Sequence, residues 1–270
     1  MLTAAPQNNS YITLVQITDS HLYQDQEGSL LAVPTLASLT AVVDLVAKEQ
    51  PEADLVLGTG DISQDGSHVS YQHYLQQIQR LQLPLRWMAG NHDVLPVLQE
   101  SSQGAQILEP YYDFANWRVI LLDSSVDGAV FGHLNEQQLK QFEQLLKDAE
   151  KRNVLVCLHH HPVEIGSSWI DRLGLNNADS FWAIVKRFPA VKAVVCGHVH
   201  QDYSGKHNGV EVYATPSTCV QFLPQSHDFA LDTQSPGYRW FRLHDCGQLE
   251  TGVSRVADGM FPADQNAWGY

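Results

Sequence analysis

Short apolar runs alternate with segments of helical periodicity from residue 11 to residue 198, and this alternation restricts the fold more than any other feature. The runs are rich in leucine and β-branched residues, which favours strands. They lie at 11–18, 53–59, 84–90, 117–124, 153–160 and 191–198. Apolar residues recur at helical spacing at 34–49, 67–82, 135–149 and 177–188. The pattern predicts an α/β fold, and Asn135 is expected to cap the helix that follows it.

The pattern changes after residue 205. Three segments there have strand character and are expected to form consecutive antiparallel strands: 206–215 (KHNGVEVYAT), 237–245 (GYRWFRLHD) and 248–256 (QLETGVSRV). Strand–helix alternation followed by hairpins predicts a layered α/β architecture with mixed sheets. No linker divides the chain, so we expect a single domain over 1–270, with a flexible N-terminus at 1–10 and a C-terminal tail at 257–270.

Five of the strand-like runs end in Asp, Asn or His. Their ends are Asp19-Ser20-His21, Gly60-Asp61, Gly90-Asn91-His92-Asp93, the run His159-His160-His161, and Gly197-His198-Val199-His200. Because ligand sites in α/β sheets gather at the carboxyl ends of strands, we expect these side chains to lie together. Residues two apart on an extended chain share a face, so Asp19 and His21 can point at one place, as can His198 and His200.

The residue types at these ends predict a metal centre. Imidazole and carboxylate suit ions such as Zn, Fe and Mn. Cysteine is missing from all five ends, which argues against a structural zinc site. The chain has four cysteines, which are widely spaced and include no CxxC pair: Cys157, Cys196, Cys219 and Cys246. This spacing is typical of a protein of the reducing cytoplasm without a disulfide framework.

The charge balance excludes some classes of partner. Asp and Glu number 30 against 16 Lys and Arg, a formal net charge of −14, which repels polyanions. We therefore expect no nucleic-acid partner. No apolar run approaches the roughly 18 residues of a membrane span, and the first ten residues do not resemble a signal peptide, so no membrane partner is expected either. We expect a small-molecule substrate, and we expect the protein to be a monomer or a homodimer.

The ordered motifs DxH, GD, GNHD, HHHP and GHxH resemble the signature of the calcineurin-like metallophosphoesterases, from residue 11 to at least 220. The stretches QITDSHL, GDISQDGSHVSYQHY, LHHHPV, VCGHVHQ and ATPSTCVQF are similar in particular to the bacterial class III 3′,5′-cyclic-AMP phosphodiesterases. The resemblance implies a four-layer α/β/β/α sandwich with two mixed β-sheets. It also implies two divalent metal ions at the strand ends, with Fe, Mn or a mixed pair expected and Zn as an option.

The resemblance also implies a ligand set. Asp19, His21 and His200 would hold one ion. Asn91, His160 and His198 would hold the other. Asp61 would bridge the two, since one carboxylate can span ions about 3.5–4 Å apart.

The choice of His160 within the run 159–161 depends on two arguments. The resemblance places the ligand two residues before Pro162, and on an extended chain His160 faces opposite to both neighbours. His159 is the alternative if a bulge shifts the register.

The activity implied is hydrolysis of 3′,5′-cyclic AMP to 5′-AMP by a metal-activated hydroxide. His92 matches the family's catalytic histidine and would assist the departing ribose oxygen, with Asp93 orienting it. The residues expected to contact the substrate are His21, Asp61, Asn91, His92 and His200.

Other functions stay open at this point. A phosphodiesterase acting on glycerophosphodiesters or 2′,3′-cyclic nucleotides would use the same metal core. A metal- or nucleotide-binding regulator without catalysis is a different class. Three local roles are also open. The segment 215–218 (TPST) can contact phosphate or sugar or form a plain turn, and Phe222 can stack on a base or pack in the core. Asp65 can cap a helix or support a ligand, or be a ligand itself.

Overall fold

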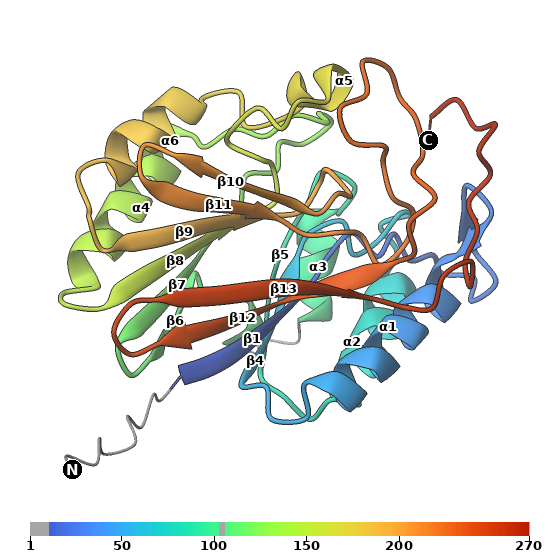
Figure 1. Cartoon of the computed structure of the whole chain (residues 1–270), viewed down its shortest axis with the longest axis horizontal. Helices are drawn as coiled ribbons and strands as arrows, with labels where there is room; N and C mark the ends of the chain where they lie inside the picture. The colour runs from blue at the N-terminus through green and yellow to red at the C-terminus, as the bar shows by residue number, and fades with distance from the viewer. Residues whose placement is uncertain (1–10, 103–105, 270) are drawn as a thin grey trace, which may run out of the picture.

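The computed structural model describes residues 11–102 and 106–269, and the N-terminal segment 1–10 lies outside them. Two sheets face each other (Figure 1). The five-stranded sheet has the order β13 (Leu249–Arg255), β12 (Gly237–His244), β1 (Tyr11–Ile17), β4 (Leu55–Thr59), β5 (Leu85–Met88). The six-stranded sheet has the order β10 (Tyr203–His207), β11 (Val210–Ala214), β9 (Val191–Cys196), β8 (Asn153–Leu158), β7 (Trp117–Leu122), β6 (Tyr111–Phe114). A short ribbon pairs β2 (Ser29–Leu30) with β3 (Val33–Pro34).

Both main sheets are mixed. In the first, β1, β4 and β5 are parallel, and β12 and β13 continue it antiparallel. In the second, β7, β8, β9 and β11 are parallel, with β6 and β10 antiparallel at its two edges. All the parallel strands of a sheet end at one edge, which is where the polar loops lie.

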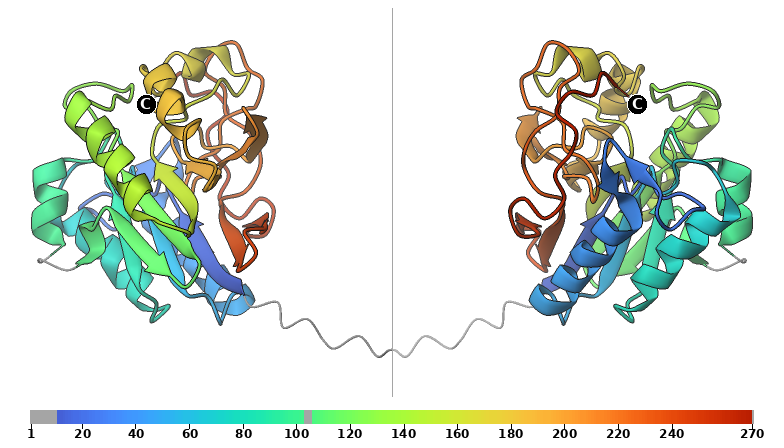
Figure 2. Two further views of the ribbon diagram at one scale, coloured as in Figure 1. Left: turned by 90° about the vertical axis from the view of Figure 1, so that its left-hand side faces the viewer. Right: turned by 90° about the vertical axis from the view of Figure 1, so that its right-hand side faces the viewer.

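Helices cover the outer face of each sheet (Figures 1 and 2). On the five-stranded sheet these are α1 (Thr35–Glu49), α2 (His68–Gln79) and α3 (Leu95–Ser101). On the six-stranded sheet they are α4 (Glu136–Asp148) and α6 (Ala178–Val185). The short helices η1 (Gln106–Leu108) and α5 (Ser168–Asp171) lie in connections. The predicted four-layer α/β/β/α sandwich is therefore confirmed.

The central strands are buried on both faces, so their two faces differ only in what they contact. On β8, Leu155 and Cys157 pack between the sheets, against residues such as Leu57 of β4. Val156 and Leu158 instead pack against the helices outside the six-stranded sheet. Since successive side chains alternate, the residue after β8 that continues the inter-sheet face is His159.

Local signals place the helices as predicted. The Asn135 side chain accepts a hydrogen bond from the Gln138 backbone N–H at 2.9 Å, and the Gln138 side chain accepts one from the Asn135 backbone. This capping box satisfies two donors that the start of α4 leaves free. Ser67 caps α2 in the simpler way, accepting from Ser70 N–H.

Two expectations about strands need correction. Four of the five strands that lead to the polar ends stop one or two residues before the predicted ends, because the polar residues leave the sheet to form the site, and β4 ends at Thr59 as predicted. The segment 206–215 is a hairpin rather than one strand, turning at Asn208 and Gly209, both with positive φ. Its second strand pairs parallel to β9, so β11 and β12 lie in different sheets and are not antiparallel neighbours.

The described part of the C-terminal tail, 257–269, has no helix or strand but packs against the body. Asp264 donates its backbone N–H to the carbonyl of Leu31 at 2.9 Å, next to the β2–β3 ribbon. Phe261 packs against two apolar clusters. Among the helices of the described residues, none is long and apolar enough to cross a bilayer.

Candidate metal centre

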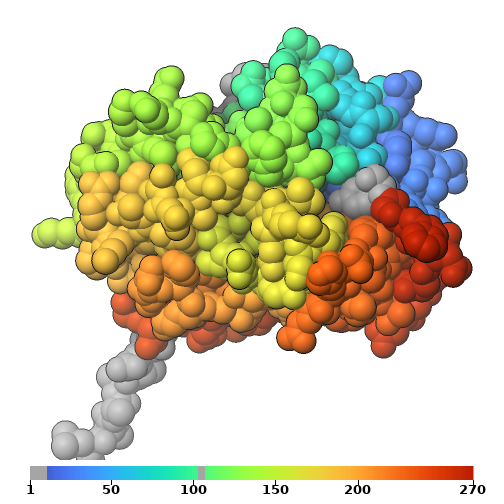
Figure 3. Space-filling model, turned by 90° about the horizontal axis from the view of Figure 1, so that it is seen from above, coloured from blue at the N-terminus to red at the C-terminus, as the bar shows by residue number. Residues whose placement is uncertain are grey.

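The polar residues that follow the parallel strands of both sheets come together at one end of the sandwich. Seen from above, the chain that follows β7 (green) lies beside the chain that follows β8 (yellow) (Figure 3). Five residues of these ends have left-handed backbone although none is glycine: Asp19, His21, Asp61, His198 and His200, with φ between 46° and 67°. Each such residue costs on the order of 1–3 kcal/mol and persists only where surrounding structure imposes it. Asp19 and His21 therefore meet through strained turns, not through the extended chain that the sequence suggested.

The first cluster joins Asp19, His21 and His200, all fully buried. The Nε2 atom of His200 lies 3.3 Å from Oδ1 of Asp19 and 3.1 Å from Nε2 of His21. The other ring nitrogens are anchored, because His21 Nδ1 donates to Oε1 of Gln64 at 2.7 Å and His200 Nδ1 donates to the Val220 carbonyl at 2.9 Å. Both imidazoles thus turn Nε2 towards the same place.

The second cluster centres on His159. Its Nδ1 donates to the Thr59 carbonyl at 2.8 Å, which leaves Nε2 facing the site. Nε2 lies 3.3 Å from Oδ2 of Asp61 and 3.2 Å from Oδ1 of Asn91. The other oxygen of Asp61 accepts the backbone N–H of His92 at 2.9 Å, and Asp61 Oδ2 is 3.9 Å from His21 Nε2. Asp61 therefore lies between the two clusters.

This arrangement of imidazole and carboxylate groups suits a cation. In the first cluster the Nε2 atoms of His21 and His200 face each other, and burial lowers the pKa of His21 to about 3, so the His21 ring is neutral at neutral pH. In the second cluster burial opposes a charge on His159, but the attraction of Asp61 raises its pKa to about 9. A metal ion would replace that proton, as is usual when imidazole binds a metal.

His198 supplies a further sign that the site fits metal. It is buried, and its Nε2 atom has no hydrogen-bond partner among the described residues. Burial and the neighbouring imidazoles hold its pKa well below the usual value, so it stays neutral. A buried polar atom without a partner is costly, and a metal ion would satisfy it. Donor types, burial and tautomers together show that the residues of a two-metal site are present.

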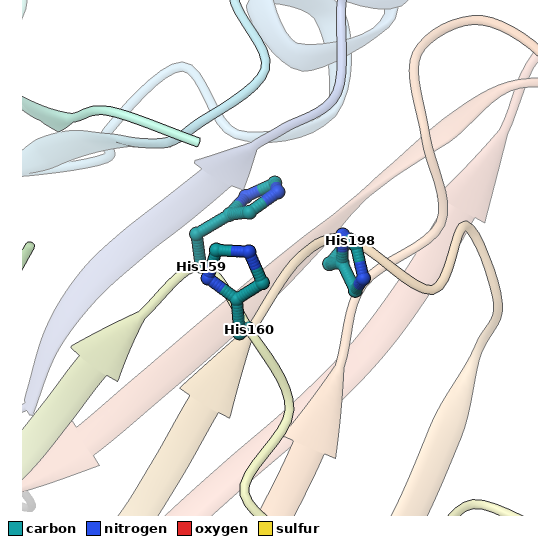
Figure 4. Close-up of side chains that lie close together, drawn as sticks. All are labelled: His159, His160 and His198. Carbon is teal, nitrogen blue, oxygen red and sulfur yellow. The ribbon is translucent and has the colours of Figure 1, made fainter. Parts of the chain in front are cut away.

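Hydrogen bonds distinguish the three histidines at 159–161 from one another. Figure 4 shows His159 and His160 beyond the end of β8 and His198 beyond β9. His160, the expected ligand, approaches the other two rings, but both of its ring nitrogens are engaged. Nε2 donates to the Val130 carbonyl at 3.1 Å and Nδ1 accepts from the Ser124 hydroxyl at 2.8 Å. The structure places His159, not His160, beside Asp61 and Asn91.

His161 points away from the two clusters towards Asp171. Its Nε2 is 3.6 Å from Oδ1 of that carboxylate, and its ring stacks on His198 with centroids 5.7 Å apart.

His92 lies at the mouth of the site and is only partly buried. Its ring is 5.0 Å from that of His21, edge to face. Asp93, expected to orient His92, instead accepts backbone N–H bonds from Gly90, Ile62 and Ser63. These bonds join the loop after β5 to the loop after β4.

The other residues for which the sequence left a role open make contacts inside the protein. Thr215, Ser217 and Thr218 are buried and donate to the Gln16 side chain, the Asp19 carbonyl and the Ser20 hydroxyl, so their hydroxyls are committed inside the fold. Phe222 is buried and stacks on His200, with centroids 4.2 Å apart and planes at 4°. Asp65 accepts backbone N–H bonds from Gln24 and Ser67, which joins two loops.

Gln64 and the carbonyls of Thr59 and Val220 were not identified from the sequence. No spacing rule marks them, since they act by holding ligand rings that come from other segments.

Two glycines allow the loops to approach each other. Gly60 has φ of +98°, and a Cβ there would collide with His159 Nδ1. A Cβ on Gly90 would collide with Asp61. Neither position has room for a side chain without moving a candidate ligand.

Comparison with known proteins identifies the family of the chain. The model of the calcineurin-like phosphoesterase family matches residues 12–202. A protein of Pseudomonas aeruginosa named 3′,5′-cyclic adenosine monophosphate phosphodiesterase CpdA is 46% identical over 98% of this chain and 97% of its own. Proteins of the same name from Vibrio vulnificus and Escherichia coli K12 are 49% and 41% identical, covering 96% and 100% of this chain and 95% and 99% of their own.

Solved structures share the fold at low sequence identity. A dimetal phosphatase from Danio rerio superposes with a TM-score of 0.62 at 17% identity, covering 91% of this chain and 99% of its own. A purple acid phosphatase from yellow lupin superposes with a TM-score of 0.67 at 14% identity, covering 96% of this chain and 54% of its own. With the matched family model and the full-length relatives, the chain belongs to the calcineurin-like phosphoesterase family.

Proposed function

We propose that this protein is a two-metal phosphodiesterase that hydrolyses 3′,5′-cyclic AMP to 5′-AMP. The observation that carries the proposal is the pair of buried Asp and His clusters with Asp61 between them. The substrate follows from relatives over essentially the whole chain that are named cyclic AMP phosphodiesterases.

The proposed ligand set follows the geometry. Asp19, His21 and His200 would hold one ion, Asn91, His159 and His198 would hold the other, and Asp61 would contact both. His159 takes the place expected of His160 because its Nε2 faces Asp61 and Asn91. When bound, the ions supply Lewis acidity to the phosphate and to a water molecule. Nitrogen and oxygen donors suit Fe, Mn or a mixed pair, and also Zn.

The protein's own groups complete the chemistry. His92 donates a proton or hydrogen bond to the ribose oxygen that leaves phosphorus, a role that general acids fill with rate effects of about 10²–10⁴. The backbone N–H of His92 is fixed by Asp61, which sets the ring at the mouth. We propose that the phosphate is met by His21, Asp61, Asn91, His92 and His200.

We also propose the cytoplasm as the location. All four cysteines are free, and three of them are buried. Free thiols are typical of a reducing compartment.

Product analysis tests the activity. The protein is reconstituted with Mn or Fe and incubated with 3′,5′-cyclic AMP with and without a chelator. Formation of 5′-AMP that the chelator abolishes is the expected result. If cyclic AMP survives while bis(p-nitrophenyl) phosphate is cleaved, the metal centre is right and the substrate is wrong, and glycerophosphodiesters and 2′,3′-cyclic nucleotides are tested next.

A further inference from the structure

A cavity of about 220 Å³ lies at the open edge between the two sheets. Its inner wall is apolar and buried, formed by Trp87, Met88, Leu121, Leu134 and Leu145. These residues come from β5, β7, α4 and the loop before α4, so four segments of the fold line it. The described residues that line the cavity include no Lys or Arg, so it is not suited to a phosphate.

Two loops that lead to the metal centre begin at residues that line the cavity. Ala89 lines it, and the next residues in the chain are Gly90, Asn91 and His92. On the other side Asp123 lines it and precedes Ser124, whose hydroxyl donates to His160. The proposal below places a molecule with its phosphate at the metal centre and its other end in this cavity.

The polar groups of the cavity lie at its outer side. Gln99 of α3 and Gln141 of α4 both line it and are exposed. No described residue hydrogen-bonds to either side-chain amide. Gln138, which also lines it, is already committed to the capping of α4 and to the Asp123 carbonyl. Two amides from different helices are thus available to a ligand in the cavity.

We infer that this cavity binds the adenine base of the substrate, an inference that depends on the function proposed above. A side-chain amide can pair bidentately with the N6 amine and an adjacent ring nitrogen of adenine. The apolar wall of Trp87, Met88 and the leucines would contact the faces of the ring. The volume is below the 300–1,000 Å³ usual for sites that enclose a whole ligand, which fits one planar ring system whose ribose and phosphate lie outside.

The test compares substrates that share the phosphodiester but differ in the base. Kinetics with 3′,5′-cyclic AMP, 3′,5′-cyclic IMP and bis(p-nitrophenyl) phosphate are measured for the native protein and for Gln99→Ala, Gln141→Ala and the double variant. Gln137→Ala is the matched control, since Gln137 is exposed on α4 and does not line the cavity.

We expect the double variant to raise KM for cyclic AMP about fivefold to tenfold, within the range of a lost bidentate amide contact. Turnover of bis(p-nitrophenyl) phosphate should not change. The native preference for cyclic AMP over cyclic IMP, which lacks the N6 amine, should fall towards one in the double variant.

An unchanged KM for cyclic AMP in the double variant, or a parallel loss with bis(p-nitrophenyl) phosphate, would overturn the base site and leave the proposed function standing. If the native protein does not hydrolyse cyclic AMP at all, both the proposed function and the base site are rejected.

Discussion

His159 and Asp61 meet across the two sheets, with Nε2 of the imidazole 3.3 Å from Oδ2 of the carboxylate. His159 follows β8 of the six-stranded sheet and Asp61 follows β4 of the five-stranded sheet. The Thr59 carbonyl, two residues before Asp61, accepts the other ring nitrogen of His159. One short segment after β4 therefore both orients the histidine and provides the carboxylate it faces.

Replacing the two histidines separately tests this arrangement. His159→Ala should lose the ion of the second cluster, whereas His160→Ala should retain both ions with affinity reduced by about 10–100-fold, as for residues that support a ligand. Metal content of the purified variants, by elemental analysis, is the measurement. Loss of one ion from His160→Ala, with full loading of His159→Ala, would restore the ligand choice made from the sequence.

His92→Ala should keep both ions and lower kcat for cyclic AMP by about 10²–10⁴. The loss should be much smaller with bis(p-nitrophenyl) phosphate, since p-nitrophenolate leaves without needing a proton. The exposed His227 provides the matched control, as His227→Ala should change neither rate. Equal losses on the two substrates would argue against a role for His92 as the acid.

Gln64→Ala should weaken the ion of the first cluster. The amide oxygen holds Nδ1–H of His21 at 2.7 Å and so fixes which ring nitrogen faces the ion. A loss of about 10–100-fold in metal affinity is expected. Titration of the metal-free protein with Mn measures it, and Gln64→Glu, which preserves an acceptor, should retain most of the affinity. Equal weakening by both variants would show that the hydrogen bond is not the cause.

Metal removal should lower the free energy of unfolding. Without an ion, nothing offsets the strained backbone of five candidate ligands, and the buried Nε2 of His198 has no partner among the described residues. An ion at one hundred times its Kd adds about 2.7 kcal/mol to the free energy of unfolding. A chelator should therefore lower the Tm measured by circular dichroism. The double variant His159→Ala/His200→Ala is the control and should show no chelator-dependent change. If the chelator does not change the Tm of the native protein, the protein does not bind a stabilising metal ion.

Thiol reactivity should separate one cysteine from the other three. Cys246 is exposed, whereas Cys157, Cys196 and Cys219 are buried. Burial raises the pKa of the Cys219 thiol to about 12, and it raises those of Cys157 and Cys196 as well, so at pH 8 these thiols are protonated and unreactive. A disulfide-exchange reagent should label one thiol in the native protein and four after denaturation, and none should be labelled in native Cys246→Ser. Rapid labelling of a second native thiol would contradict the structure.

The sequence predicted the loops of the site but not the orientation within one of them. The ends of five strand-like runs carry Asp, Asn or His, and β-sheet topology brings such ends together, so Asp19, Asp61 and His200 were identifiable. The orientation of the three histidines at 159–161 could not be predicted in this way. The strand before them, β8, is apolar on both faces, so its residues do not show which face meets the other sheet. Only packing reveals that Cys157, and hence His159, faces inward.

The residues of distant segments that orient the candidate ligands could not be predicted from the sequence either. Val220 orients His200 through a carbonyl that every residue has, and Phe222 stacks on the same ring while looking like any core aromatic. The hydroxyls of 215–218 are compatible with phosphate binding in sequence, and only the fold shows that they are turned towards Gln16, Asp19 and Ser20.

The candidate ligands divide between the sheets in a way that matters for assembly. Asp19, His21, Asp61 and Asn91 follow strands of one sheet, whereas His159, His198 and His200 follow strands of the other. Each proposed ion would thus be held by both sheets, as a cross-link that forms only after the inter-sheet core has closed. Neither half alone offers a complete site, so tight metal uptake during refolding should coincide with the docking of the two halves.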